Sequence, residues 1–312
     1  MTEVKFREMR FDLDATVPFQ WNTDNPVSGI VSNAISFMAV GFERYIVLVV
    51  KDAMKGVTDP AVREEADAFL KQEAQHSAAH AKHVKALVAQ YPGLADALQG
   101  VLKSYEELYK AQPTKFHLAY IASIEATFTP LFSFIIDNRH RLMNGDCRIA
   151  SLFLWHYVEE LEHRSSANII YDAVVNDRWY RVRTLGAAMA HCTELMRIIS
   201  EGFATHVPPE DIGTDPMVVS GKMLQVEFLR RIPMLRQLVK SEPATLYEGI
   251  STKDVLKLFA GLLKSQFPSH EPGESTIPAW YDAWMKSYHA GEDMAHYFGT
   301  PARRARDLAA AE

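Results

Sequence analysis

The segment Trp155-His-Tyr-Val-Glu-Glu-Leu-Glu-His163 decides which kind of fold this chain can form. His156, Glu160 and His163 are spaced by four and then three residues, so on an α-helix all three side chains project from one narrow face. In helical bundles that hold two metal ions, two Glu-x-x-His motifs are joined by a lone Glu from each of two further helices. The segment therefore predicts a helix that carries metal ligands.

The other parts of that arrangement occur elsewhere in the chain. Glu73 and His76 form a second Glu-x-x-His motif, and Glu43 and Glu125 each stand alone within a long apolar run. An ionised carboxylate among apolar side chains is costly unless it is paired or bound to a metal. The order Glu, Glu-x-x-His, Glu, Glu-x-x-His thus predicts a dimetal site. Its expected ligands are Glu43, Glu73, His76, Glu125, His156, Glu160 and His163.

Helical periodicity and chain breakers predict four long helices, at about residues 27–54, 60–90, 114–141 and 147–175. A shorter helix at about 94–110 connects the second to the third, and Gly56, Pro92-Gly93 and Asn144-Gly145 mark the breaks. The two candidate ligands of each hairpin fall at similar depths on either side of the turn. Two hairpins joined by a longer crossover form the ferritin-like connectivity. We therefore predict an all-α fold, a ferritin-like four-helix bundle that carries a dimetal site, with additional C-terminal helices.

The predicted organisation has three parts. Residues 1–26 form an N-terminal arm, residues 27–176 the dimetal four-helix core, and residues 177–312 a set of C-terminal helices that pack on the core. Further helices are expected at about 178–201, 216–240, 252–265 and 279–289.

Composition excludes several functional classes. The chain has 312 residues, of which 48% are hydrophobic and 23% charged, with a net charge of −6. This balance supports a large core and argues against nucleic acid as a partner, because phosphate binding needs a concentrated basic surface. Two cysteines give no disulfide framework, and the charged N-terminus is not a signal peptide, so we expect a cytoplasmic protein. No uninterrupted apolar run of about 18 residues predicts a membrane span.

Several assignments within the site stay open. His156 is a candidate third imidazole ligand, and His80 is a candidate ligand or a proton carrier, so both are catalytic candidates. Glu159 could compete with Glu160 as a ligand, although a solvated helical face is the simpler interpretation of Glu159 and Glu162. His83 is interpreted as structural or exposed. We expect Glu43 and His76 with Glu73 to hold one metal and His156, Glu160 and His163 the other, with Glu73 and Glu160 or Glu125 available as bridges between them.

The ligand pattern resembles that of the ferritin-like diiron carboxylate proteins, which include the ribonucleotide reductase small subunit, bacterial monooxygenases and aryl-amine N-oxygenases. His156-x-x-x-Glu160-x-x-His163 is similar to the extra-histidine site of the N-oxygenases. Residues 72–80, 155–163 and 267–272 together resemble a bacterial family labelled predicted metal-dependent hydrolases. The last element, Phe267-Pro-Ser-His-Glu-Pro272, differs from the tighter Phe-His-Pro form of that family.

Carboxylate-rich ligands without thiolate suit iron or manganese, so the expected cofactors are two metal ions, with iron first, then manganese or a mixed pair. The leading hypothesis is a diiron oxidase or oxygenase that activates O₂ to oxidise a small organic substrate. The electrons for this reaction would come from an electron donor. A dinuclear hydrolase with a metal-bound hydroxide is the alternative. A metal-storage bundle without catalytic activity is the second alternative. A homodimer is the default assembly.

Overall fold

The computed structural model describes residues 7–219 and 245–300, and the regular structure in these ranges is helical, apart from a single bridge between Asp146 and Thr300. The helices of the first hairpins are α1 (Pro26–Ala53), α2 (Pro60–Gln90), α3 (Leu94–Ala111), α4 (Thr114–Asp137), α5 (Arg139–Leu142), α6 (Cys147–Glu162) and α7 (Ser166–Val174). The later helices are α8 (Arg178–His206), α9 (Pro209–Ile212), α11 (Thr252–Ser265) and α12 (Trp280–His289). Short 3₁₀ turns are η1 (Met54–Gly56), η2 (Pro216–Val219), η4 (Thr245–Tyr247), η5 (Pro272–Glu274) and η6 (Met294–His296). The prediction of an all-α bundle is confirmed.

Local sequence explains where the main helices begin. Asn25 accepts a hydrogen bond from the Ser28 N–H at the start of α1, and Asp59 does the same for Ala61 at the start of α2. Pro26 and Pro60 occupy the first turns, where the missing N–H has no helical partner to lose. Asp146 caps α6 in the same way. The predicted beginnings are therefore accurate to within a residue or two.

Two predicted helices end earlier than their periodicity suggested. The helix expected over 114–141 stops at Asp137, where the Asn138 side chain donates to the Phe134 carbonyl. The helix expected over 147–175 breaks after Glu162, and Arg164 donates to the Leu161 carbonyl in place of a backbone N–H. Side chains that satisfy the last carbonyls of a helix favour such a stop. His163 is consequently the C-terminal cap of α6.

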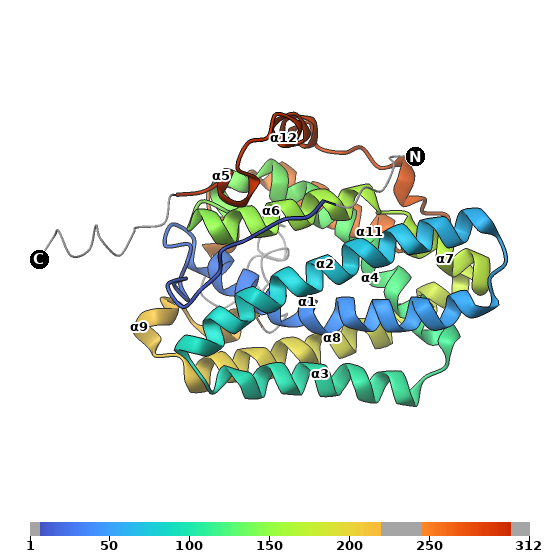
Figure 1. Ribbon diagram of the computed structural model, residues 1–312, viewed down its shortest axis with the longest axis horizontal. Coiled ribbons are helices and arrows are strands. Elements are labelled where there is room, and N and C mark those ends of the chain that lie inside the picture. Colours follow the sequence, from blue (N-terminus) through green and yellow to red (C-terminus); the bar gives the residue numbers. More distant parts are fainter. Residues whose placement is uncertain (1–6, 220–244, 301–312) are drawn as a thin grey trace, which may run out of the picture.

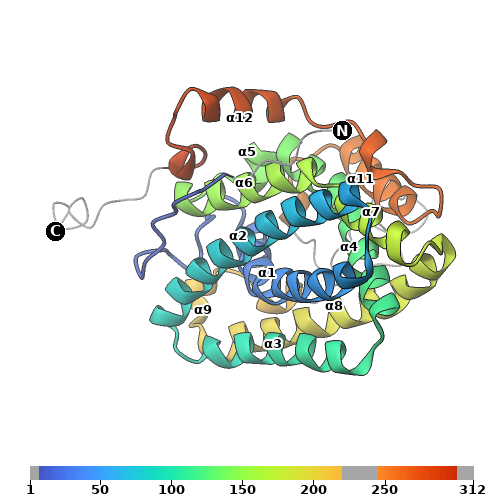
Figure 2. The same ribbon diagram turned by 45° about the vertical axis from the view of Figure 1, so that its right-hand side comes forward.

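The helices pack around α6. Every residue from Cys147 to Glu162 is buried, which is the pattern of a helix surrounded by protein on all sides. α1 packs along α2, α4 packs against α6 and α7, and α8 packs against α3 and α4. Figures 1 and 2 show α12 on one side of the molecule, over α6, and α3 on the opposite side, alongside α8. The C-terminal helices therefore enclose the bundle on two sides.

Two helical stretches, Pro26–Gly56 and Thr114–Asp137, are long and apolar enough to cross a bilayer, each with a mean hydropathy of 1.5. The sequence analysis did not anticipate this. Within the protein, 72% and 67% of their most apolar windows are buried. Packing against neighbouring helices accounts for their apolar character, so they are weak evidence for a membrane span.

The remaining expected helices follow the prediction in part. α11 matches the expected range, and α12 begins one residue later than expected. α8 extends to His206, beyond the expected end. The helix expected at 216–240 begins as the 3₁₀ turn η2, and residues 220–240 lie outside the described residues.

Candidate metal centre

The structure brings all seven predicted ligands together inside the bundle. Each is at most 4% exposed. Their ligand atoms form two groups, and within each group the atoms lie within 4.8 Å of one another. The first group consists of Glu43, His76 and His156. The second group consists of Glu73, Glu125, Glu160 and His163.

This grouping differs from the expected one. His156 is grouped with Glu43 and His76, although it also lies 2.8 Å from Glu160, whereas it was expected to share a metal with Glu160 and His163. Glu73 lies with the second group instead of the first. The reason is that His156 and His163 lie about two helical turns apart on α6, so His156 reaches Glu43 of α1 whereas His163 reaches Glu73 of α2 and Glu125 of α4.

Glu160 lies between the two groups. Its Oε1 atom is 2.8 Å from His156 Nε2 and 3.5 Å from His76 Nδ1, whereas its Oε2 atom is 2.9 Å from His163 Nε2. His156 Nε2 is also 3.4 Å from Glu43 Oε1. His163 Nε2 is 3.2 Å from Glu73 Oε1 and 3.9 Å from Glu125 Oε2. Glu160 is therefore placed to give one oxygen to each group, as a bridging carboxylate does.

The electrostatics of the site fit bound cations. Burial, and next the nearby charge of Glu160, raises the pKa of Glu43, Glu73 and Glu125 well above the ordinary value. Burial and the neighbouring His156 lower the pKa of His76. Burial opposes ionisation of Glu160, but attraction to His163 and hydrogen bonds with His156 and His163 hold its pKa below the ordinary value.

Several ligand atoms also have no hydrogen-bond partner. These are Glu43 Oε2, both oxygens of Glu73, His76 Nδ1 and Glu125 Oε1. Buried polar atoms are almost always paired, and each unpaired one requires an explanation. A pair of metal ions would satisfy these atoms and balance the four buried carboxylates, so the residues fit the dimetal hypothesis.

A polar network lies behind two of the histidines. Glu159 Oε2 lies 3.0 Å from His76 Nε2, and the Gln72 side-chain oxygen lies 2.7 Å from His163 Nδ1. These contacts orient each ring and leave His76 Nδ1 and His163 Nε2 facing the ligand groups. We refer to the residues of this arrangement as the polar network. They are Arg7, Gln72, Glu159, Glu162 and Tyr281, whose hydroxyl donates to Glu162 at 2.6 Å.

Arg7 holds the network together. Its guanidinium donates to Glu162 at 2.6 and 2.7 Å and to Glu159 at 3.3 Å, and it lies over the rings of Trp284 and Tyr288 of α12. The interpretation of Glu159 and Glu162 as a solvated face is wrong, because they are 0% and 5% exposed. A helix buried on all sides has no solvated face, and these carboxylates are paired with Arg7 instead.

His80 lies next to the first group without belonging to it. Its Nε2 is 2.8 Å from His156 Nδ1, and its Nδ1 is 2.9 Å from Ser36 Oγ. Ser36 Oγ in turn lies 2.8 Å from His83 Nδ1. The order His156, His80, Ser36, His83 thus forms a continuous hydrogen-bonded chain of buried groups. His83 belongs to this chain, which the sequence analysis did not foresee, and burial lowers its pKa to about 3.

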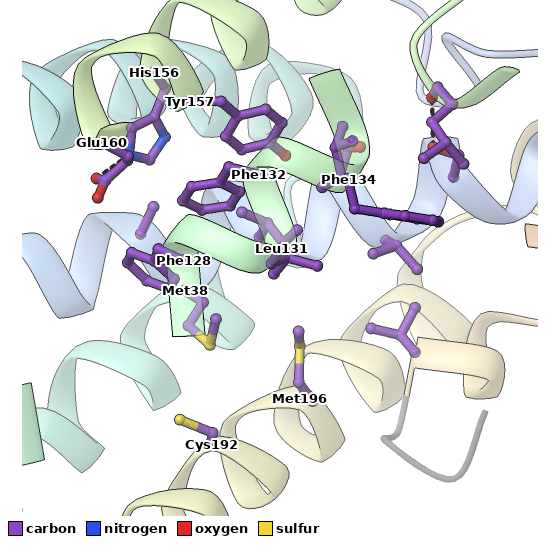
Figure 3. Close-up of a pocket in the computed structure, with 18 of the residues that line it drawn as sticks. Met38, Phe128, Leu131, Phe132, Phe134, His156, Tyr157, Glu160, Cys192 and Met196 are labelled. Atoms are coloured by element: carbon purple, nitrogen blue, oxygen red, sulfur yellow. Dashed lines mark hydrogen bonds and ion pairs between the residues drawn. The ribbon is translucent and has the colours of Figure 1, made fainter. Parts of the chain in front are cut away.

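A cavity of about 280 Å³ reaches the candidate ligands from the opposite side (Figure 3). Glu43, Glu73, His156 and Glu160 form part of its wall. The rest of the wall is mainly apolar and comes from α1, α4, α6, α8, η2 and η4. Among these lining side chains are Met38, Phe128, Leu131, Phe132, Tyr157, Cys192 and Met196. We refer to this space as the apolar cavity.

Comparison with known protein families agrees with the metal-binding geometry. A family profile described as "predicted metal-dependent hydrolase" matches residues 5–289. The chain belongs to this family. Searches of the curated proteins and of the solved structures found no match. Membership of the predicted metal-dependent hydrolase family therefore supports a metal-dependent activity, whereas the type of reaction must be argued from the site.

Sequence reasoning missed the polar network and the apolar cavity of this family member. Gln72 and Glu159 carry a weak sequence signal, since each lies next to a predicted ligand in a Glu-x-x-His segment. Arg7 carries none, because only the folded path of the N-terminal arm brings it to α6. The cavity residues are ordinary apolar helix residues until the packing shows which of them face a space.

Proposed function

We propose that this chain is an oxidoreductase with a dinuclear metal centre, taken to be diiron, that uses O₂ to oxidise a small organic substrate. One observation carries the proposal: a buried, carboxylate-rich ligand set lies at the end of an apolar cavity. Among the described residues that line this cavity, none is Lys or Arg. Such a site can bind an apolar molecule next to the metals and keep bulk water away from the reaction.

Seven residues would hold the metals. Glu43, His76 and His156 would bind one ion, and Glu73, Glu125, Glu160 and His163 the other. Carboxylate and imidazole donors without thiolate suit iron and manganese. Two iron ions held by these residues would supply electrons for the reduction of O₂.

The surrounding side chains have distinct roles in this proposal. Glu159 and Gln72 orient His76 and His163 through the ring nitrogens that face away from the ligand groups. His80 does the same for His156, because the Nδ1 proton of His156 can be donated to His80 Nε2. The aromatic and aliphatic wall of the apolar cavity excludes water and positions the substrate.

The family description favours a second candidate, a dinuclear hydrolase. In that reading the same carboxylates and histidines would hold metals that act on an ester, amide or phosphate bond. A hydrolase would be active without O₂ or a reductant and would retain activity with zinc or manganese. Among the described residues, the lining of the apolar cavity is mainly aliphatic and aromatic and offers no Lys or Arg to a polar reacting group, which places this candidate second.

Metal analysis tests the proposal. The wild type, Glu125→Gln, Glu160→Gln and the exposed control Glu106→Gln would be purified from cells grown with iron and examined by elemental analysis. Optical spectra would be recorded after reduction and exposure to O₂. We expect about two irons per chain and an O₂-dependent absorption band in the wild type and control, and loss of both in Glu160→Gln. Zinc without any O₂ response would favour the hydrolase, and absence of metal from the wild type would refute both candidates.

A further inference from the structure

Among the described residues that line the apolar cavity, Tyr157 carries a buried hydroxyl that the metal centre does not use. Tyr157 lines the cavity and is 0% exposed, and its hydroxyl has no hydrogen-bond partner. A phenol has an ordinary pKa of about 10, so the hydroxyl keeps its proton at neutral pH and can act as a donor. A buried donor without an acceptor is unfavourable, and a ligand in the cavity could supply the missing acceptor.

The position of Tyr157 relates this donor to the metal centre. Its ring stacks on Phe132, with 4.2 Å between the ring centroids and an interplanar angle of 18°. In Figure 3 the hydroxyl end of the Tyr157 ring points away from His156 and Glu160. A ligand that accepts from this hydroxyl would therefore have its polar atom set apart from the candidate metal ligands, with an apolar portion left beside them.

The shape and charge of the cavity limit the ligand further. The cavity extends from Glu43 and Glu160 to Met189 and Thr193 on α8, which are exposed. Apart from the candidate metal ligands, its described lining contains no carboxylate, imidazole, ammonium or guanidinium group. Away from the candidate metal ligands, an ionised group on the ligand would be desolvated without a counter-ion, which costs far more than burying a neutral acceptor.

We propose that the cavity binds an elongated, uncharged molecule with an apolar body and one hydrogen-bond acceptor, of the class of long-chain ketones, aldehydes or esters. Tyr157 donates to that acceptor. The proposal rests on the proposed function only in taking this cavity as the substrate site, and its test requires neither metal nor turnover.

Competition binding tests the ligand class. The neutral fluorophore N-phenyl-1-naphthylamine would report occupancy of the full-length protein as purified, and ten-carbon competitors would displace it. Methyl octyl ketone is expected to displace the probe at a concentration at least about tenfold lower than decanoate, because decanoate carries a charge. Equal displacement by decanoate would overturn the assignment of an uncharged ligand.

Tyr157→Phe tests the hydrogen bond while keeping the ring. We expect this variant to bind methyl octyl ketone about fivefold to tenfold more weakly, which is the usual range for one neutral hydrogen bond, and to bind decane with unchanged affinity. An equal loss of affinity for both competitors would mean that Tyr157 only shapes the cavity wall. Unchanged affinity for both would mean that it makes no contact with the ligand. Either result would refute the role assigned to the hydroxyl.

A matched pair on α8 tests the location. Thr193 and Thr205 are both exposed and each donates to the carbonyl four residues earlier, but only Thr193 lines the cavity. Thr193→Trp should weaken probe binding at least about tenfold by filling the mouth, while Thr205→Trp should not change it. Equal effects would place the ligand elsewhere. If the protein binds the ketone but contains no metal, the proposed function is refuted and this inference is not. If the protein contains two irons but binds no probe, this inference is refuted and the proposed function is not.

Discussion

The two sides of the metal centre are built from opposite materials. On one side the polar network pairs Arg7 with Glu162 and Glu159, and Glu159 with His76, through a continuous set of hydrogen bonds. On the other side the apolar cavity presents aromatic, aliphatic and methionine side chains, together with an unpartnered hydroxyl. The same seven residues therefore have a rigid support behind them and an adaptable space in front.

This difference indicates a division of work. Charge-assisted hydrogen bonds specify one orientation for each histidine, and losing one partner leaves another buried and unpaired. Apolar contacts are non-directional and tolerate changes of similar volume. We therefore expect changes to the ligands and the polar network to alter metal binding and stability strongly, and changes to the apolar cavity to alter mainly what the site binds.

Metal removal should have the largest effect. Metal ions at about a thousand times their dissociation constant should stabilise the folded chain by about 4 kcal/mol per site. Burial raises the pKa of Glu43, Glu73 and Glu125, so the folded metal-free protein binds more protons than the unfolded chain. Its free energy of unfolding should fall as pH rises from about 4.3, the unfolded value, towards the raised values.

Bound metal displaces those protons and removes this penalty. The difference in Tm between the metal-loaded and the chelator-treated protein should therefore widen with rising pH, and differential scanning calorimetry across a pH series would measure it. Glu160→Gln serves as the control and should show little metal-dependent difference. A difference that narrows as pH rises would contradict the assignment of these carboxylates as ligands.

Arg7→Met should have the next largest effect. Arg7 is 3% exposed, and its removal leaves Glu159 and Glu162 buried without their cation. Loss of one partner of a buried ion pair costs about 3 to 5 kcal/mol. Urea unfolding would measure it against Arg10→Met on the same arm, whose exposed pair with Glu8 should contribute less than about 1 kcal/mol. Equal stability of the two variants would show that the polar network does not support the fold.

Gln72→Leu should act on metal affinity more than on stability. This substitution removes the side-chain oxygen that orients His163 and leaves Glu73, the adjacent candidate ligand, in place. Loss of such a supporting hydrogen bond typically lowers metal affinity about 10-fold to 100-fold. Competition with a chelator would measure it, with Gln90→Leu as the control on α2, since Gln90 bonds to the Val17 carbonyl instead. Unchanged metal affinity would show that Gln72 does not support metal binding.

Leu131→Ala should have the smallest effect. Leu131 is half-buried and already borders the apolar cavity, so truncation enlarges an existing space (Figure 3). We expect the free energy of unfolding to fall by about 2 kcal/mol or less, below the usual range for truncation of a buried leucine, with metal content unchanged. Leu118→Ala on the same helix, 2% exposed and outside the cavity, should cost more. A loss of metal in Leu131→Ala would show that the two sides of the centre are coupled.

Much of the fold could be predicted because helical signals are local. Caps such as Asp59 and Asp146, and breakers such as Gly56 and Pro92-Gly93, act within a few residues of their own positions. The two ends predicted wrongly, after Asp137 and Glu162, depend on side-chain bonds from Asn138 and Arg164 to nearby carbonyls. Periodicity does not report such bonds, because the apolar pattern continues past the point where the helix stops.

The seven candidate ligands were also recognisable, since Glu43 and Glu125 make chemical sense among apolar neighbours only with a partner. Glu159 and Glu162 show where that reasoning stops. A carboxylate on a helix is solvated or buried according to what packs against it, and here α6 is enclosed on all sides.

The sequence by itself determined the helices and the identity of the candidate ligands, because both depend on spacing along one chain. The tertiary structure alone decided how those ligands group, which nitrogen of each histidine faces the centre, that Arg7 reaches α6, and where the apolar cavity opens. These features depend on contacts between α1, α2, α4, α6 and α8, whose residues lie far apart in the chain. Their relative positions follow from packing, and no local pattern encodes them.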